Sequence, residues 1–250
     1  MLTLGHNNRF NFDFYYNNND KYVGCQIAYD NYEPFESQLF IDSIRSDSVL
    51  LDVGANIGYY TILGSKIITT GDIYSFEPCR LNYQLLEMNI LKNRIKRTHP
   101  YRMAISNKSG KAGLYLSEDN AGDHQLYFNP DRISEEVETI SIDEFIEDHN
   151  VHPDIIKIDT QGFDYFVLLG MSNLISRKST LTIFTEFWNH GNLAANVSPI
   201  NYFGFLKHNF NSVHYIDELK ETTYPVDYTF IEEECKKYEG KNHINLLCKK

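Results

Sequence analysis

Cysteine is scarce in this 250-residue chain, and the four cysteines form no recognisable motif. None of them belongs to a C-x-x-C pair, and their spacing is not that of a zinc finger. They are also too sparse for the disulfide framework of a small secreted protein. The cysteines therefore exclude those classes and favour a reducing compartment inside the cell.

Long apolar runs are also missing. No uninterrupted apolar segment approaches the roughly 20 residues that a membrane helix needs. The first 20 residues contain neither the basic region nor the apolar core of a secretory signal. We therefore expect a cytoplasmic protein with no membrane partner.

Positive charge is in short supply. Lys and Arg total 23 against 34 Asp and Glu, which gives a formal net charge of -11. Such an acidic chain repels phosphate backbones, so we expect no nucleic-acid partner. The content of 42% hydrophobic and 23% charged residues is nevertheless typical of a globular protein, and the length favours one domain.

Apolar runs and helical patterns alternate along the first part of the chain. After an irregular aromatic leader (1–45) with one helix over 34–45, the pattern predicts a strand over 48–53, a helix over 59–68, a strand over 72–77, a helix over 80–93 and a strand over 101–106. This β-α-β-α-β order is typical of a parallel sheet with right-handed crossovers.

The second part of the chain continues the alternation. The pattern predicts an exposed strand over 111–117, a loop over 118–131, a short helix over 141–147, a strand over 154–159, a helix over 163–175, a strand over 181–187, a helix over 199–208, and two strands over 212–216 and 243–248 that form an antiparallel pair. We expect a single domain over 1–250, with a cofactor-binding core at 46–190 and C-terminal strands at 191–250. A polar, acidic insertion covers 217–241.

The sharpest motif is the turn DVGANIGYYT, which directly follows the first strand and opens a helix. Gly54 permits a tight turn with close ligand approach, and Gly58 lets the helix pack near the strand. The dinucleotide pattern G-x-G-x-x-G is not met, because Asn56 and Tyr59 occupy its second and third glycine positions. No Gly-Lys-Ser/Thr follows either, so the turn is not a Walker A loop.

A carboxylate ends the next strand. Glu77 follows Gly58 by 19 residues, where an acid in nucleotide-binding α/β folds accepts both ribose hydroxyls. Asp52, at the end of the first strand, is placed to face an amino group or to orient the glycine turn. Together these residues predict a site for an adenosine attached to an amino acid, without a pyrophosphate.

Four blocks of the sequence resemble the FkbM-type methyltransferases, a family of class I S-adenosylmethionine-dependent enzymes. The blocks are VLLDVGANIGYYT, IYSFEP, IIKIDTQGFDYFVLLG and TIFTEF, and the resemblance runs from about Tyr32 to Phe187. It implies an α/β, Rossmann-like sheet of seven mostly parallel strands with helices on both faces, and S-adenosylmethionine as cofactor. Family members more often carry Val-Glu-Gly where this chain has Thr160-Gln161-Gly162, so any role of that family acid is not carried over to position 161.

The resemblance also assigns the cofactor site. It implies a methionine-binding loop of Asp52, Gly54, Asn56 and Gly58, a ribose contact at Glu77, and an adenine border at Met103 and Ala104. Asp159 falls where such enzymes place polar groups of the active site. No dense carboxylate cluster demands a metal ion, and no metal site is assigned; Asp159 and Glu186 are the carboxylates that could bind a hard cation, so the use of a divalent metal stays open.

A hydroxyl acceptor must lose a proton when it is methylated, and a carboxylate or histidine near the strand ends can take it. The candidates are Asp159, Glu186 and His190 at the ends of the fourth and fifth strands, and His124 in a polar loop.

The resemblance implies O-methylation of a hydroxyl on a sugar or small metabolite, with a small-molecule or glycan acceptor as the partner. Three alternatives remain: an N-methyltransferase on the same scaffold, a cofactor-binding module without catalysis, and a nicotinamide oxidoreductase. The missing glycine at position 56 argues against the last. The sequence does not indicate the oligomeric state.

Overall fold

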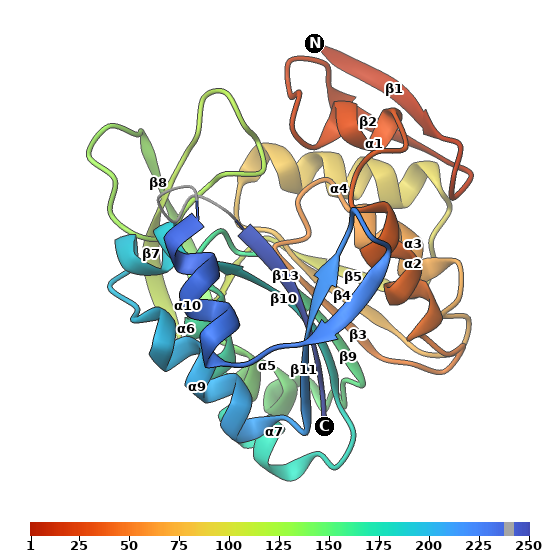
Figure 1. Cartoon of the computed structure of the whole chain (residues 1–250). Helices are drawn as coiled ribbons and strands as arrows, with labels where there is room; N and C mark the ends of the chain where they lie inside the picture. Colours follow the sequence, from red (N-terminus) through yellow and green to blue (C-terminus); the bar gives the residue numbers. More distant parts are fainter. Residues whose placement is uncertain (238–242) are drawn as a thin grey trace.

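The computed structural model describes residues 1–237 and 243–250, and its centre is a mixed sheet of eight strands (Figure 1). The strand order is β12 (Thr222–Pro225), β11 (Ser212–Asp217), β13 (His243–Lys249), β10 (Thr182–Trp188), β9 (Ile155–Ile158), β3 (Leu50–Val53), β4 (Ile73–Phe76) and β5 (Thr98–Tyr101). The strands from β10 to β5 are parallel, and β13 is antiparallel to both of its neighbours. The expected Rossmann-like α/β fold is therefore confirmed.

The sheet has one strand more than the seven expected. The additional strand, β12, pairs with β11 as the return arm of a hairpin, and it lies inside the insertion at 217–241. The same insertion contains helix α10 (Tyr228–Lys236). Its positions 238–241 lie outside the described residues.

The two central strands are buried along their whole length. Every residue of β3 and β9 is buried, as expected of parallel strands covered on both faces. Asp52 in β3 and Lys157 in β9 are the polar exceptions in these strands. Each of them therefore needs a partner inside the protein.

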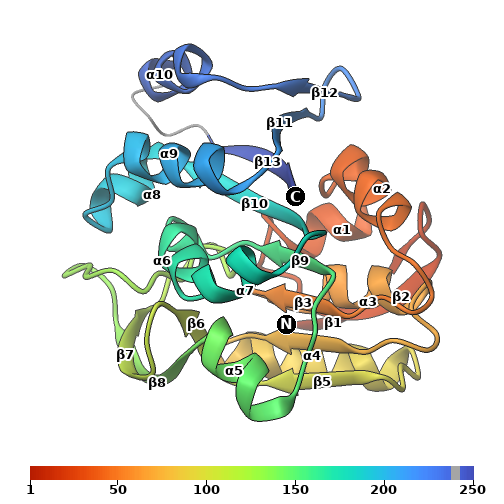
Figure 2. The same cartoon turned by 90° about the horizontal axis from the view of Figure 1, so that it is seen from below.

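Helices cover both faces of the sheet, and each face has its own apolar core. On one face lie α1 (Gly24–Ala28), α2 (Pro34–Asp42) and α3 (Tyr59–Ser65). On the other lie α5 (Ile142–His149), α6 (Asp164–Leu169), α7 (Ser172–Arg177), α9 (Pro199–Asn209) and α10. Figures 1 and 2 show the two groups on opposite sides of the strands.

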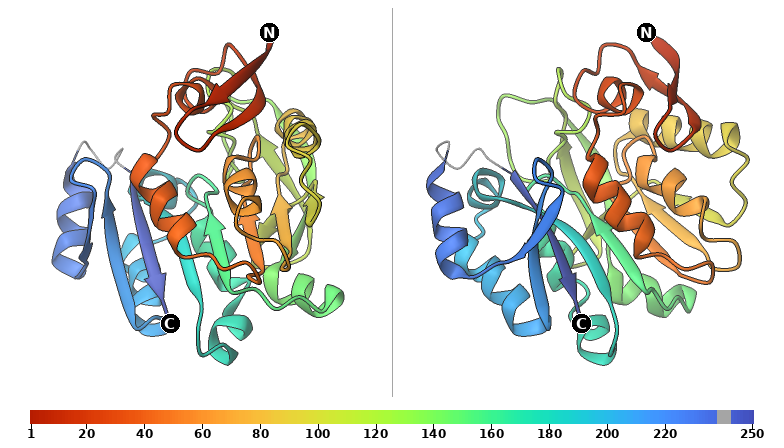
Figure 3. Two further views of the ribbon diagram at one scale, coloured as in Figure 1. Left: turned by 90° about the vertical axis from the view of Figure 1, so that its right-hand side faces the viewer. Right: turned by 45° about the vertical axis from the view of Figure 1, so that its right-hand side comes forward.

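The leader is more ordered than expected. The helix expected over 34–45 is confirmed as α2, but the residues before it include a hairpin of β1 (Leu2–Asn7) and β2 (Phe12–Asn17). This hairpin packs on helix α4 (Arg80–Lys92), where the Asn89 side chain bonds both the N–H and the C=O of Tyr15. Figure 3 shows the N-terminus and the C-terminus at opposite ends of the molecule.

The strand expected over 101–106 is wrong in its bounds. The chain leaves the main sheet after Tyr101, and β6 (Ala104–Ser106) joins a second sheet of order β6-β8-β7, with β7 at Gly110–Tyr115 and β8 at Ser134–Ser141. Strand β8 was not expected, because its charged residues resemble a loop. In the structure these residues alternate with inward-facing ones such as Val137.

The helix expected over 163–175 is interrupted, giving α6 and α7. A Cβ on Gly170 would lie 2.1 Å from the carbonyl oxygen of Ser106, so the chain passes there without a side chain. Helix α5 begins where expected, and the Ser141 hydroxyl accepts from the N–H of Glu144 as an N-cap.

Candidate active site

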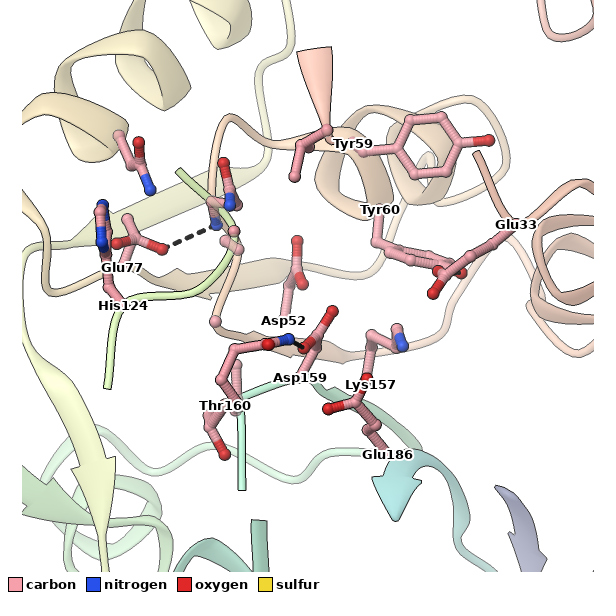
Figure 4. A pocket seen from close by; sticks show the side chains of 18 of the residues that line it. Glu33, Asp52, Tyr59, Tyr60, Glu77, His124, Lys157, Asp159, Thr160 and Glu186 are labelled. Atoms are coloured by element: carbon pink, nitrogen blue, oxygen red, sulfur yellow. Dashed lines mark hydrogen bonds between the residues drawn. The ribbon is translucent and has the colours of Figure 1, made fainter. Parts of the chain in front are cut away.

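A pocket of about 490 Å³ opens at the carboxyl ends of β3, β4, β9 and β10. In open α/β sheets this edge is where ligands bind. Figure 4 shows Glu77 and His124 at one side of the pocket and Glu33, Lys157 and Glu186 at the other. We call the first side the Glu77 end and the second the acidic end.

The glycine turn between β3 and α3 forms the floor of the pocket. Gly54 has a φ of +81°, and a Cβ there would lie 1.9 Å from the carbonyl oxygen of Asp159. Gly58 has a φ of +92°, and a Cβ there would lie 2.7 Å from Leu86. Both positions therefore require glycine, one for contact with β9 and one for contact with α4.

Glu77 lines the Glu77 end of the pocket beside the glycine turn. Its carboxylate accepts from the backbone N–H groups of Asn56 and Cys79, each at 2.8 Å. Burial raises the pKa of Glu77 to about 8, although these two hydrogen bonds act in the opposite direction. The dashed line in Figure 4 marks the bond to Asn56, which ties the carboxylate to the glycine turn.

Asp52 is buried between β3 and α3. Its Oδ2 accepts from the Thr61 hydroxyl at 2.5 Å, and that hydroxyl also contacts the Ser75 hydroxyl at 2.7 Å. Burial raises the pKa of Asp52 to about 6. Asp52 therefore lines the pocket from a fixed position, with one of its oxygens held by Thr61 of α3.

The loop at 118–131 covers the Glu77 end. The Asn56 and Asn82 side chains both donate to the carbonyl oxygen of Ala121, at 3.2 and 2.8 Å. Within the loop, the N–H of Ser117 donates to Nδ1 of His124. Burial, with Arg132 nearby, lowers the pKa of His124. A neutral ring whose Nδ1 accepts this bond carries its proton on Nε2, so His124 is set up as a donor.

The acidic end contains a carboxylate–histidine pair. Glu186 Oε1 lies 2.8 Å from Nδ1 of His243, and the Trp188 ring stacks on the imidazole at 5.2 Å and 12°. Burial raises the pKa of Glu186 to about 7. The bond to Glu186 raises the pKa of His243 to about 9. Asp159 lies beside this pair, and its Oδ1 accepts from the Gln161 amide at 2.7 Å.

A buried lysine completes the acidic end. Lys157 Nζ lies 3.0 Å from Glu36 Oε1 of α2 and 4.8 Å from the centre of the Tyr60 ring. Burial alone lowers the pKa of Lys157, but Glu36, Glu33 and Asp159 together raise it well above its ordinary value. Lys157 is therefore held as a cation among carboxylates.

Most of the expected site residues come together in this pocket. Those that line it are Asp52, Gly54, Asn56, Glu77, Met103, Ala104, His124, Asp159 and Glu186. Gly58 shapes the turn from outside the lining. His190 is exposed at the start of α8 (Asn189–Ala194), outside the lining, with its ring 5.5 Å from that of Trp188.

Sequence reasoning missed Glu33, Lys157 and His243, which also line the pocket. A lysine within an apolar strand was a visible signal for Lys157. No local signal marked Glu33 or His243, because α2 and β13 bring them to the site from distant parts of the chain.

The described residues contain neither a metal-binding cluster nor a membrane-spanning helix. Residues 1–237 and 243–250 contain no group of three or more His, Cys, Asp and Glu side chains that could hold a metal ion. In the same ranges, no helix is long and apolar enough to cross a membrane.

The fold and the position of the pocket define a class I methyltransferase architecture. The methyltransferase FkbM domain family matches residues 52–206, more than half of the chain. The chain therefore belongs to this family.

Comparison with a curated protein gives a relative in the archaeon Haloferax volcanii. The hexuronic acid methyltransferase AglP is 32% identical over 141 residues, which cover 55% of this chain and 56% of AglP. The chain thus matches little more than half the length of this relative.

Solved structures share the fold at low sequence identity. The complex of aTrm5 with tRNALeu contains a chain with 9% identity and a TM-score of 0.51, and the match covers 99% of this chain and 52% of that one. Precorrin-6y C5,15-methyltransferase from Geobacter metallireducens has 12% identity and a TM-score of 0.46, with 85% and 86% coverage. The first of these likenesses shows a common fold.

Proposed function

We propose that this chain transfers the methyl group of S-adenosylmethionine to a hydroxyl of a sugar or small metabolite. The observation that carries the proposal is the glycine turn held against Glu77 at one end of a pocket whose other end is lined by Asp159, Glu186 and His243. Membership of the methyltransferase family and the hexuronic acid methyltransferase relative support it.

The residues of the Glu77 end fit the cofactor. In the glycine turn, the buried Oδ1 of Asn56 has no hydrogen-bond partner among residues 1–237 and 243–250, which leaves it open to a ligand. We assign Glu77 to the ribose hydroxyls and Asp52 to the amino acid part, with Met103 and Ala104 bordering the base. The acidic lining favours a cofactor that carries a sulfonium charge.

Bound S-adenosylmethionine supplies an electrophilic methyl carbon, which bonds to the acceptor oxygen as the carbon–sulfur bond breaks and its electron pair stays on sulfur. The chain must then align the acceptor and remove its hydroxyl proton. We propose that Nε2 of His243 accepts the hydroxyl proton, because Nδ1 is already hydrogen-bonded to Glu186. Glu186 is then a positioning residue, and Asp159 is left to bind the acceptor.

Calorimetric titration with S-adenosylhomocysteine tests the cofactor site. Wild type should bind, and Glu77→Ala should weaken binding about tenfold, because a hydrogen bond contributes about 0.5–1.5 kcal/mol and Glu77 would bond both ribose hydroxyls. Glu147→Gln, an exposed change on α5, is the matched control and should bind as wild type does. Equal affinity of Glu77→Ala and wild type would remove Glu77 from the ribose role.

Methyl transfer tests the reaction. Incubation with S-adenosylmethionine and a panel of sugars, hydroxylated metabolites and amines should give S-adenosylhomocysteine and an O-methylated product, identified by mass spectrometry and NMR. Methylation of amines alone would replace the proposal with N-methylation. Binding without transfer to any acceptor would favour a cofactor-binding module.

A further inference from the structure

The acidic end has many carboxylates and few cations. Glu33, Asp159, Glu186 and Glu218 line the pocket, whereas the described lining residues include one lysine and no arginine. A carboxylate-bearing ligand is normally recognised by arginine or lysine, because their N–H groups pair with its oxygens. The charge of this end therefore bears on which acceptor it can hold.

The one lysine is not available to a ligand. The Lys157 side chain is 2% exposed, and Glu36 Oε1 and the Tyr60 ring already flank its ammonium group. Lys157 lines the pocket, but Glu36 is fully buried, so the Lys157 ammonium group is directed at the interior between α2 and β9. A ligand carboxylate would have to displace one of these groups to reach Nζ, which would leave a buried charge without its partner.

His243, the other group that can carry a positive charge at the described acidic end, also has an acidic partner. His243 directs Nδ1 at Glu186, so its charge is balanced inside the protein. By contrast, Glu33 and Asp159 have neutral hydrogen-bond partners. Glu33 accepts from the Tyr60 hydroxyl at 2.6 Å and from the Asn245 amide at 3.1 Å, and Asp159 accepts from the Gln161 amide. Among residues 1–237 and 243–250, no cation is matched to either of these two carboxylates at this end of the pocket.

We infer that the acceptor is an uncharged, hydroxyl-bearing sugar, and that a sugar carrying a carboxylate is rejected. Hydroxyl groups donate hydrogen bonds to carboxylates such as Glu33 and Asp159, whereas a hexuronate would meet them with like charge. This inference rests on the proposed function and narrows its substrate class. It separates this chain from the relative AglP, which is named for a hexuronic acid.

Matched acceptors that differ only in charge provide the test. Each of the gluco-, galacto- and manno-configured pyranosides is offered as the hexuronic acid, as its uncharged amide and as the parent hexose, at pH 8 with S-adenosylmethionine. We expect the amide or the hexose to be methylated at least about tenfold faster than the acid, by kcat/KM. Equal or faster methylation of the acid would overturn the inference.

Failure of the proposed function gives a different result. In that case none of the sugars is methylated, although S-adenosylhomocysteine still binds in calorimetry. The inference about the acceptor would then fall as well, whereas a preference for the acid would overturn the inference alone.

A charge variant locates the source of the preference. Glu33→Gln keeps a hydrogen-bonding group of the same size and removes one negative charge, so the amide-to-acid ratio of kcat/KM should fall severalfold. Glu147→Gln on exposed α5 removes the same charge far from the pocket and should leave the ratio unchanged. An unchanged ratio in Glu33→Gln would show that the charge of the acidic end does not select the acceptor.

Discussion

At the scale of single residues, Gly54 is held by two independent constraints. Its φ of +81° disfavours any side chain, and the space for a Cβ is taken by the backbone of Asp159. The clash involves backbone rather than a flexible side chain, so it cannot be relieved by a change of rotamer. The glycine turn is therefore built on a close approach between the residues that follow β3 and β9.

We expect Gly54→Ala to lower the free energy of unfolding by about 2–3 kcal/mol or more, because it combines an unfavourable φ with a backbone clash. Urea denaturation measures the loss. Gly113→Ala in β7 is the control, since its Cβ would meet nothing closer than 3.5 Å, and it should stay within about 0.5 kcal/mol of wild type. A loss for Gly54→Ala as small as that of the control would contradict the interpretation.

The pair of Glu186 and His243 predicts an alkaline pH dependence of kcat/KM. His243 can accept a proton only when neutral, and its pKa is raised to about 9 by Glu186, with Asp159 and Asp123 contributing. Activity should therefore rise with pH through about 9. Glu186→Gln removes the main cause of the raised His243 pKa. The midpoint of the pH profile should therefore move toward the ordinary histidine value of about 6.5, and kcat/KM at high pH should be lower.

The exposed histidine of α8 provides the control for this pH profile. His190→Gln lies outside the pocket and should keep the wild-type midpoint. If Glu186→Gln also keeps that midpoint, His243 is not the group that accepts the proton.

The predicted site residues that line the pocket next to the glycine turn share one property. Gly54 and Glu77 act next to the strand ends that precede them, so local pattern is enough to find them. His243 reaches the site only because β13 returns antiparallel to β10, opposite Trp188. Such long-range pairing leaves no periodicity to recognise, so His243 is not among the residues that the sequence predicts for the site.

At the scale of elements, the contact between α2 and β9 is an ion pair inside an apolar core. Glu36 and Lys157 are 0% and 1% exposed and belong to elements far apart in sequence. Burying two charges is costly, and removing one partner leaves the other uncompensated. This pair therefore fixes how α2 docks on the sheet more than it adds net stability.

A double-mutant cycle tests this role. Glu36→Leu should cost about 3–5 kcal/mol of unfolding free energy, because it leaves Lys157 as an unpaired buried cation. Lys157→Met should cost less, since the pKa of Glu36 is raised to about 8 and the carboxyl can take a proton. The double variant should lose less than the sum of the two, as measured by urea denaturation.

The exposed pair of Lys111 and Glu136 is the control for this cycle. Removing either partner there should change stability by no more than about 1 kcal/mol. Strict additivity of the buried substitutions would contradict a coupled pair.

The elements that the sequence did not predict have a hydrophobic pattern that depends on the elements packed against them. Strand β8 is rich in glutamate, and the N-terminal hairpin is rich in asparagine and aromatic residues. Neither has the continuous apolar run that marks β3 or β9, because each covers another element on one face only. The helix expected over 163–175 has helical periodicity throughout, and only the tertiary contact at Gly170 interrupts it.

At the scale of the whole molecule, buried carboxyls set how stability depends on pH. Burial raises the pKa of Glu77 from 4.5 to about 8 and that of Asp52 from 3.8 to about 6. The folded chain therefore binds more protons than the unfolded chain between these values. The stabilisation is complete below the unfolded pKa values and is lost as pH rises through the folded ones.

We therefore expect the Tm of the protein without cofactor to fall as pH rises from about 5 to about 9, by differential scanning calorimetry. His243, whose folded pKa is raised to about 9, acts in the same direction. Glu77→Gln should flatten the fall in its upper part, near pH 8. A Tm that increases over this range would contradict the buried-carboxyl account.

The side chain of Asn89 makes hydrogen bonds to both the N-terminal hairpin and the glycine turn. Besides its two bonds to Tyr15, Asn89 donates to the carbonyl oxygen of Ile57 in the glycine turn at 2.8 Å. A shortened protein that keeps only residues 52–206 would lack the hairpin that covers the Asn89 side chain. Water would then reach the glycine turn that Asn89 supports. For anyone trimming the chain for crystallisation or engineering, the first 17 residues therefore support the glycine turn through Asn89.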